Sequence, residues 1–389
     1  MNILHVTAGI QETCGVSCFV METARAQMAL GHRVCVVTTM TCGYPVGDVD
    51  VRLMDNPTSV DFQPDIVHIH GIWSRYLHRM AAWCRKRRIP YIVSPHGALT
   101  KWALRYHWWK KLPAMLLYQY RDLRIARGFH VTVQEEVADV RRLRLSQPVV
   151  VAPLGVVLQA EQPQDSKHKD ILFLGRIHPV KNLDSLLKAW QGLPTEQRQG
   201  WRIIIAGPDD VGHQAELKEL AGRLGLSVRD FSKELEFGKK QIHGGNEVPL
   251  KVYQEKLSEI KADVVFTGPV YSETKDWLYQ QSRFFVLPSH SENFGGVILE
   301  ALAAGTPCIA TKGTPWASLP EHHCGWWVED DVEAIRKSLL KCLNLSGDSY
   351  AQMSGNARDF VAKNYSWGTS AKILLDAYSK ICEECKNEH

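Results

Sequence analysis

The chain has 389 residues, about twice the size of a typical single domain, so two domains with separate cores are expected. Its composition is that of an ordinary globular protein, and no apolar run approaches the roughly 18 residues of a membrane-spanning helix, which excludes such a span. The net charge is only +4, but residues 1–160 hold 19 Lys and Arg against 11 Asp and Glu, a net of +8 that leaves −4 for the rest. A basic face on the first domain is therefore expected.

The number and spacing of the cysteines indicate whether the protein is expected in a reducing or an oxidising compartment. There are ten, scattered along the chain, and residues 1–15 lack the basic start and apolar run of a secretory signal peptide. Free thiols are favoured over metal or redox pairs at Cys14/Cys18 and at Cys382/Cys385, because neither pair has a convincing second set of ligands. We expect a cytoplasmic protein that, if membranes matter, lies peripherally on their inner face.

The first half of the chain follows a β-α-β rhythm. Residues 2–8 are predicted as a buried strand, 16–30 as an apolar-faced helix closed by Gly31, and 33–39 as the next strand. Short apolar strands are predicted to follow at residues 65–70 and 91–94. This pattern indicates a doubly wound parallel sheet, and we assign residues 1–157 to this N-terminal, Rossmann-like domain.

A polar stretch at residues 158–169 is predicted to be a linker, after which the pattern restarts. The second Rossmann-like domain is placed at 170–367, with a helix at 183–190 and strands at 171–175, 202–206, 264–267 and 284–288. Residues 228–261 are polar and are interpreted as an insertion. The final segment, 368–389, has the apolar spacing of a helix.

The most informative segment is Ser291–Pro307, which follows an apolar strand. It is predicted as a glycine-bearing loop and a helix that ends at Gly305 and Pro307. Gly295 and Gly296 would let backbone N–H groups approach a ligand, and the helix N-terminus favours an anion such as a diphosphate. An ordinary buried helix is the less favoured alternative.

A second constellation is Gly175–Leu183, again between a predicted strand and a predicted helix. Lys181 stands where that helix begins, a position that is mildly unfavourable for a cation unless an anion binds nearby. The alternative is a solvated surface lysine.

Glu292 and Glu300, separated by seven residues in this setting, resemble the signature of family 4 of the retaining glycosyltransferases. The resemblance covers nearly the whole chain and implies the α/β GT-B fold, with two Rossmann-like domains facing a central cleft and a final helix that crosses back to the first domain. It implies that Glu292 meets the donor sugar and that Glu300 holds the ribose. Arg176 and Lys181 would bind the donor diphosphate, and we count Asn293, Phe294, Gly295 and Gly296 among the substrate-binding residues.

The resemblance also assigns two residues of the first domain. Gly15 would belong to a glycine-bearing loop near the diphosphate, in a stretch that lacks the Gly-x-Gly-x-x-Gly pattern of dinucleotide-binding enzymes. His96 would be the active-site histidine near the donor sugar. His68 and His70 share one strand face; we leave them as acceptor-side candidates, with a structural role favoured.

The function implied is a retaining transfer of a hexose or N-acetylhexosamine from a nucleotide-diphosphate sugar, with UDP favoured over GDP, to a glycan or lipid-linked hydroxyl in cell-surface polysaccharide synthesis. The alternatives are a nucleotide-sugar epimerase and a catalytically inactive nucleotide-sugar-binding relative. No cofactor or metal is expected. The Asp48-Val49-Asp50 stretch resembles a metal-binding Asp-x-Asp only superficially, because it lies in a turn-rich segment far from the other motifs.

Residues 101–127 interleave aromatic and basic side chains, with Asp122 as the one acid among them. Such a composition suits a helix that lies in the headgroup region of an anionic membrane, and a helical pair that covers the core of the first domain is the alternative. No nucleic-acid-binding motif accompanies these charges, so a nucleic-acid partner is not expected.

Overall fold

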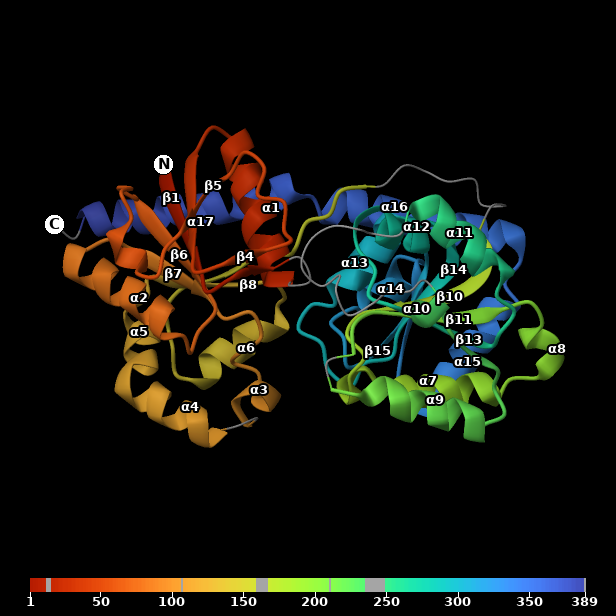
Figure 1. The fold of residues 1–389 in the computed structure, drawn as a ribbon. Helices are drawn as coiled ribbons and strands as arrows, with labels where there is room; N and C mark the ends of the chain where they lie inside the picture. Colours follow the sequence, from red (N-terminus) through yellow and green to blue (C-terminus); the bar gives the residue numbers. More distant parts are fainter. Residues whose placement is uncertain (12–14, 106–107, 159–166, 210, 235–248, 388–389) are drawn as a thin grey trace. The chain divides into compact units, whose positions relative to one another are not determined.

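The computed structural model describes residues 1–11, 15–105, 108–158, 167–209, 211–234 and 249–387, in two compact units (Figure 1). Unit 1 comprises Met1–Gly155 and Tyr365–His389, and unit 2 comprises Val156–Asn364. The chain leaves unit 1 and re-enters it at one place, where Gly155 packs against Trp367. The contact is so close that a Cβ atom on Gly155 would lie 2.4 Å from the backbone nitrogen of Trp367. In this division unit 2 begins at Val156, ahead of the segment predicted as a linker, of which residues 159–166 lie outside the described residues.

Unit 1 is built on a seven-stranded parallel sheet, as the β-α-β rhythm predicts. The strand order is β5 (Asp50–Leu53), β3 (Arg33–Thr38), β1 (Asn2–Thr7), β6 (Ile66–His70), β7 (Tyr91–Ser94), β8 (Gly128–Val131) and β9 (Val149–Val151). A separate parallel pair joins β2 (Ile10–Gln11) to β4 (Thr41–Cys42).

Alternate residues of these strands face two different cores. Ile3 and Ile66 pack with Phe19 of α1 (Gly15–Ala29) and Tyr378 of α17 (Trp367–Asn387), so the final helix completes the core of unit 1. The opposite core contains strand side chains together with residues of α2 (Arg75–Arg87) and α5 (Tyr120–Ile125). The remaining helices of unit 1 are η1 (Pro57–Ser59), α3 (Lys101–Arg105), α4 (Trp108–Ala114), the π-helical turn η2 (Met115–Gln119) and α6 (Glu135–Arg142).

Unit 2 holds a second seven-stranded parallel sheet. Its order is β12 (Val228–Asp230), β13 (Val264–Gly268), β11 (Arg202–Ala206), β10 (His168–Leu174), β14 (Ser282–Leu287), β15 (Cys308–Thr311) and β16 (Gly325–Val328). Its helices are η4 (Pro179–Lys181), α7 (Leu183–Gln191), α8 (Thr195–Arg198), α9 (His213–Arg223), α10 (Phe231–Glu234), α11 (Leu250–Glu259), α12 (Ser272–Gln281), α13 (Gly296–Ala303), α14 (Ser318–Glu321), α15 (Val332–Leu343) and α16 (Gly347–Asn364).

The insertion predicted at residues 228–261 is wrong at both of its ends. Residues 228–230 form the edge strand β12, paired with β13, and Tyr253 and Leu257 of α11 are buried. These segments are polar overall because an edge strand and a surface helix each bury only one side. The middle of the predicted insertion, residues 235–248, lies outside the described residues.

Both sheets reverse their strand order at the centre. In unit 1 the chain runs outward from β1 to β5 and returns to β6 on the other side of β1; in unit 2 it runs from β10 to β12 and returns to β14. Loops that follow the two central strands diverge at such a switch point, where α/β sheets bind ligands. Among the described helices, none is long and apolar enough to cross a bilayer.

Candidate active site

Lys181 follows β10 and is held toward the end of the neighbouring strand β14. His178 caps the short helix η4 by accepting a hydrogen bond from the Val180 nitrogen, 3.2 Å away. The next residue, Asn182, is buried with a left-handed φ of 56°, and its side-chain amide donates to the carbonyls of Pro288 and Asp330 at 3.1 and 2.8 Å. These bonds fix the backbone beside Lys181 against the β14 loop.

Glu292 stands in the loop after β14, directly beside that lysine. Nζ of Lys181 donates a hydrogen bond to Oε1 of Glu292, and the Ser289 hydroxyl donates to the same oxygen at 2.8 Å. Both members of the ion pair are about 14% exposed. The two predicted motifs are therefore one site, with a carboxylate and an ammonium at the switch point of the sheet.

The start of α13 lies in the same loop. Gly295 caps it with a φ of 73°, a conformation that disfavours any side chain, and the Trp316 indole donates to the Phe294 carbonyl at 2.6 Å. The Oδ1 atom of Asn293 is buried without a hydrogen-bond partner. A helix N-terminus beside an unsatisfied buried acceptor is suited to a ligand that carries both an anion and hydroxyl groups.

Glu300 lies on α13 with two partners that the sequence motifs do not reveal. The Tyr279 hydroxyl donates to Oε2 at 2.9 Å, and Lys275 donates to Oε1 at 3.1 Å. Burial, and next the charge of Glu300, raises the pKa of Tyr279 well above its ordinary value, so the phenol stays a donor. Both partners come from α12, and together they hold a carboxylate that is still 31% exposed.

Arg176 lies in the loop between β10 and Lys181. Its flanking residues are anchored to the loop after β11, since Gly175 N donates to the Ala206 carbonyl at 3.0 Å and Ile177 N to the Pro208 carbonyl at 2.8 Å. The arginine side chain is exposed. It thus leaves the same edge of the sheet as the Lys181–Glu292 pair.

His96 belongs to unit 1, at the carboxyl end of β7. It has a left-handed φ of 49°, and the following Gly97 donates its N–H to buried Glu136, 3.1 Å away. Glu136 also accepts from the nitrogen and hydroxyl of Thr132, at 3.0 and 2.8 Å, and burial raises its pKa. Glu136, which sequence reasoning missed, therefore fixes the backbone turn that presents His96.

Gly15 is the first residue of α1, and a Cβ atom built there meets nothing within 4 Å. The preceding residues 12–14 of the predicted glycine-bearing loop lie outside the described residues. Gly15 and His96 belong to unit 1, and the predicted donor-binding residues belong to unit 2.

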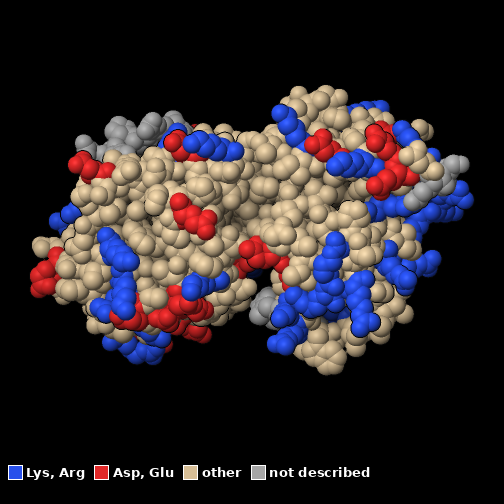
Figure 2. Space-filling view, turned by 180° about the vertical axis from the view of Figure 1, so that it is seen from behind, with Lys and Arg blue, Asp and Glu red and all other residues tan. Residues whose placement is uncertain are grey.

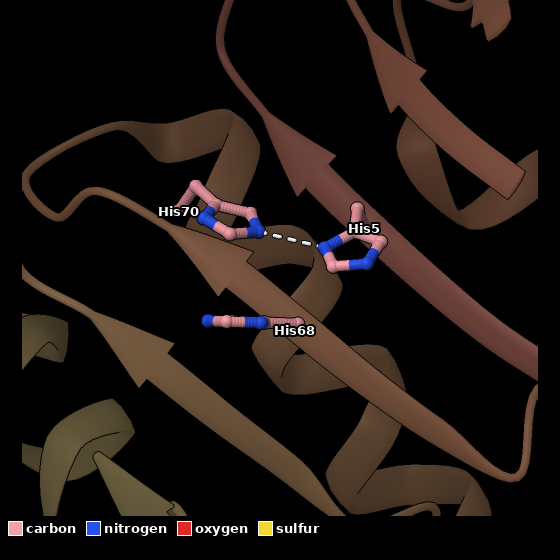
Figure 3. A group of neighbouring side chains, drawn as sticks. All are labelled: His5, His68 and His70. Carbon is pink, nitrogen blue, oxygen red and sulfur yellow. Dashed lines mark hydrogen bonds between the residues drawn. The ribbon is translucent and has the colours of Figure 1, made fainter. Parts of the chain in front are cut away.

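His68 and His70 are buried on β6, beside His5 of β1 (Figure 3). The side chain of His70 bonds His5 and His96, and His68 bonds Ser94 and Tyr378. Asp50 of the Asp-x-Asp stretch accepts from its neighbour Arg52, with Oδ2 to Nη2 at 2.8 Å, and this contact lowers the pKa of Asp50. Each of these groups thus already has protein partners.

Comparison with known proteins agrees with this geometry. Residues 158–231 and 241–360 match the family described as glycosyl transferases group 1, and residues 46–155 match the glycosyl transferase 4-like domain. The first match is interrupted at residues 232–240, inside the segment interpreted as an insertion.

The curated relatives include the O-antigen chain mannosyltransferase B of Escherichia coli, 29% identical over 54% of this chain and 45% of that protein. The chain thus spans less than half the length of that relative. The D-inositol 3-phosphate glycosyltransferase 2 of Catenulispora acidiphila is 25% identical over 89% of this chain and 76% of its own length.

Among solved structures, HepE of Anabaena in complex with UDP and glucose superposes with a TM-score of 0.69 at 16% identity, covering 98% of this chain and all of that one. WaaG, a glycosyltransferase involved in lipopolysaccharide biosynthesis, gives a TM-score of 0.64 at 16% identity over 97% and 99% of the two chains. Two parallel-sheet units, an ion pair at the switch point and these matches together show that the chain belongs to the GT-B glycosyltransferases of the family 4 type.

Proposed function

We propose that the chain transfers a hexose or N-acetylhexosamine from a UDP-sugar to a hydroxyl of a glycan or lipid-linked acceptor, with retention of the anomeric configuration, in the synthesis of a cell-surface polysaccharide. The observation that carries the proposal is the Lys181–Glu292 pair beside the N-terminus of α13. The site combines cations and backbone N–H groups with carboxylates. A nucleotide-diphosphate sugar needs both.

The charges of the site residues indicate what each would do in the reaction. A leaving diphosphate gains negative charge as the glycosidic bond breaks, and the fixed cations of Lys181 and Arg176 stabilise that charge most in the transition state. Glu292, paired with Lys181, would accept hydrogen bonds from the sugar hydroxyls, and Glu300 would hold the ribose. These two cations would supply the charge that a metal ion provides elsewhere, so we propose a metal-independent reaction.

The acceptor would attack the anomeric carbon from the face that the diphosphate leaves. The C–O bond to the diphosphate breaks as the new glycosidic bond forms, and the proton of the acceptor hydroxyl passes to the departing phosphate oxygen. Support for UDP as the nucleotide comes from HepE, which is described with UDP and glucose, and the mannosyltransferase relative supports a hexose.

We also propose that the protein is cytoplasmic and attaches to the inner face of an anionic membrane through residues 108–125. Figure 2 shows a cluster of blue Lys and Arg side chains on the surface of unit 1. On helices α4 and η2 the side chains of Trp108, Leu116 and Leu117 are 57%, 77% and 80% exposed. Exposed apolar groups with basic neighbours match the headgroup boundary of an anionic bilayer.

Asp122 does not weaken this surface, because it is buried. It accepts from Arg85 at 2.5 Å and from His78 at 2.7 Å, both on α2. Arg121 and Arg124, in contrast, are exposed. The single acid of residues 101–127 thus binds α5 to α2, and the outward face keeps its positive charge.

The proposed function is tested by a thermal-shift screen of UDP, GDP and their sugars, followed by donor turnover with and without a lipid-linked glycan acceptor. We expect stabilisation by UDP, acceptor-dependent release of UDP and a product whose anomeric proton shows the donor configuration by NMR. Conversion of the donor sugar without acceptor would favour an epimerase instead. Nucleotide-sugar binding without any turnover would favour an inactive relative.

A further inference from the structure

A buried hydrogen-bonded network in unit 1 begins at His96 and runs away from the sheet edge into the core. Besides Gln27 of α1 and Tyr378 of α17, it contains five histidines, four on the strands β1, β6 and β8 and one in the turn after β7: His5, His68, His70, His130 and His96. Burial lowers the pKa of His5 and of His130 to about 4, and it holds the pKa values of His68 and His70 well below that of a free histidine. Their rings are therefore neutral at pH 7, and each has one donor and one acceptor nitrogen.

One branch of the network has its direction fixed by the backbone. Nε2 of His130 lies 2.9 Å from the Ala152 carbonyl, which can only accept, so His130 carries its proton on Nε2. Its Nδ1 must then accept from the Ser94 hydroxyl at 2.6 Å, and Ser94 accepts from Nε2 of His68 at 2.5 Å. Nδ1 of His68 is left to accept from the Tyr378 hydroxyl, also at 2.5 Å.

The other branch ends at Gln27. Oε1 of Gln27 lies 2.9 Å from Nε2 of His5, whereas the amide nitrogen of Gln27 is buried without a hydrogen-bond partner. A carboxamide oxygen can accept a hydrogen bond but cannot donate one. His5 is therefore the donor to Gln27.

The donor and acceptor of each further hydrogen bond can be assigned in turn, from His5 through His70 to His96 at the sheet edge. With its proton on Nε2, His5 accepts at Nδ1 from Nε2 of His70 over 2.8 Å, the bond drawn in Figure 3. Nδ1 of His70 then accepts from Nε2 of His96 over 3.2 Å. The rings of His70 and His96 are stacked, with centroids 5.4 Å apart, so the second bond also fixes the plane of His96.

An alternative role of His5, His68 and His70 is to bind a metal ion, since the ligand atoms of these three residues lie within 4.8 Å of one another. Nitrogens that share a tetrahedral zinc ion are about 3.3 Å apart, given Zn–N bonds of about 2.0–2.1 Å. Nδ1 of His5 and Nε2 of His70 are closer than that, at 2.8 Å. A metal would have to break this bond and at least one of the two bonds of His68, so the hydrogen-bonded arrangement accounts for the geometry better.

We infer that Gln27, acting through His5 and His70, is a positioning residue that holds His96 in the Nε2–H tautomer, so that Nδ1 of His96 presents a lone pair at the sheet edge. A lone pair there accepts a hydrogen bond and cannot donate one. We identify the group that donates to Nδ1 of His96 as a hydroxyl of the donor sugar, and this identification rests on the proposed function. The tautomer itself does not.

The test is a nitrogen NMR spectrum of the full chain labelled with ¹⁵N-histidine at pH 7.5, without substrate, with the His96 signals assigned by their loss in His96→Gln. Protonated and unprotonated ring nitrogens have well-separated shifts. We expect a protonated Nε2 and an unprotonated Nδ1 in the wild type. In Gln27→Met, which removes the terminal acceptor, we expect the two tautomers of His96 to become mixed.

Thr23→Val is the matched control. Its buried hydroxyl lies on the same helix one turn before Gln27 and has no hydrogen-bond partner, so this change should leave the His96 signals unaltered. An Nδ1–H tautomer in the wild type would overturn the inference even if Gln27→Met failed to fold. So would an unchanged tautomer in Gln27→Met, or near-stoichiometric zinc in the purified protein that is lost in His5→Gln. Loss of transferase activity has no bearing on these signals, so the two proposals fail separately.

Discussion

Lys181 donates a hydrogen bond to Glu292 across 111 residues of sequence, and the contact joins the loops that follow the two central strands of unit 2. A second bond supports it, from the nitrogen of His290 to the carbonyl of Val180 at 2.9 Å. A cation and a carboxylate are thus preorganised at one point before substrate binds.

Replacing Lys181 or Arg176 by alanine should lower kcat by about 100-fold or more, because each change removes one charge that stabilises the departing diphosphate. Steady-state kinetics with saturating donor measures the effect. Lys188→Ala is the control, since that exposed lysine on α7 pairs with Asp184 of its own helix. An unaltered kcat in both variants would falsify the diphosphate assignment.

Glu300→Gln should raise the KM for the donor and weaken binding of the nucleotide, with a much smaller change in kcat. Ribose hydroxyls do not change charge during transfer, so the contact stabilises ground state and transition state almost equally. Titration calorimetry with UDP provides the binding constant. Glu219→Gln, an exposed residue of α9, is the control. A large loss of kcat at unchanged UDP affinity would contradict the ribose role.

Activity should persist in an excess of EDTA, because Lys181 and Arg176 would supply the positive charge at the diphosphate. Product release is measured in EDTA and again after adding Mn²⁺ or Mg²⁺. Activity that disappears with EDTA and returns with either ion would exclude the metal-independent mechanism.

Stability should fall as the pH falls from about 6.5 toward 4. His5 and His130 have folded pKa values of about 4, whereas an unfolded histidine titrates near 6.5. Inside this window the unfolded chain binds protons that the folded chain does not, which costs up to about 1.4 kcal/mol of unfolding free energy per pH unit for each histidine. Above the window both states are neutral and these groups contribute nothing.

Urea denaturation at pH 7, 6 and 5 measures this dependence. His5→Gln should have a shallower slope than the wild type, because it removes one buried ring that the folded chain keeps neutral. Equal stability of the wild type at pH 7 and pH 5 would show that the buried rings are not kept neutral by folding.

The protein should co-sediment with vesicles that contain phosphatidylglycerol and should be released by high salt, whereas phosphatidylcholine vesicles should bind it weakly. Arg121→Gln with Arg124→Gln should weaken the binding by about 30-fold, at roughly 1 kcal/mol per cation. Leu116→Ser with Leu117→Ser should weaken binding at every salt concentration. Leu53→Ser, a change at another exposed leucine of unit 1, is the control. A protein that stays in the low-salt supernatant would refute the proposal.

The sequence alone determined the alternation of strands and helices and the positions of the motifs along the chain. Strands such as Tyr91–Ser94 and Arg202–Ala206 are found with the predicted bounds, because a strand buried on both faces of a parallel sheet is a short continuous apolar run. The segment from Ser291 to Pro307 was interpretable by itself, since a loop and the helix after it are adjacent in the chain. Shorter or more polar strands, such as Val149–Val151 and Val228–Asp230, were missed because little in three residues distinguishes a strand from a loop.

Tertiary structure alone decided which side chains meet and which are exposed. The partners of Glu300 lie on another helix, and the partners of His96 come from neighbouring strands whose register no local pattern encodes. Composition pointed to the tryptophans and cations of residues 101–127, but not to exposed Leu116 or buried Asp122. Exposure depends on which face of each helix packs on the sheet, and that choice is made by the summed burial of distant segments.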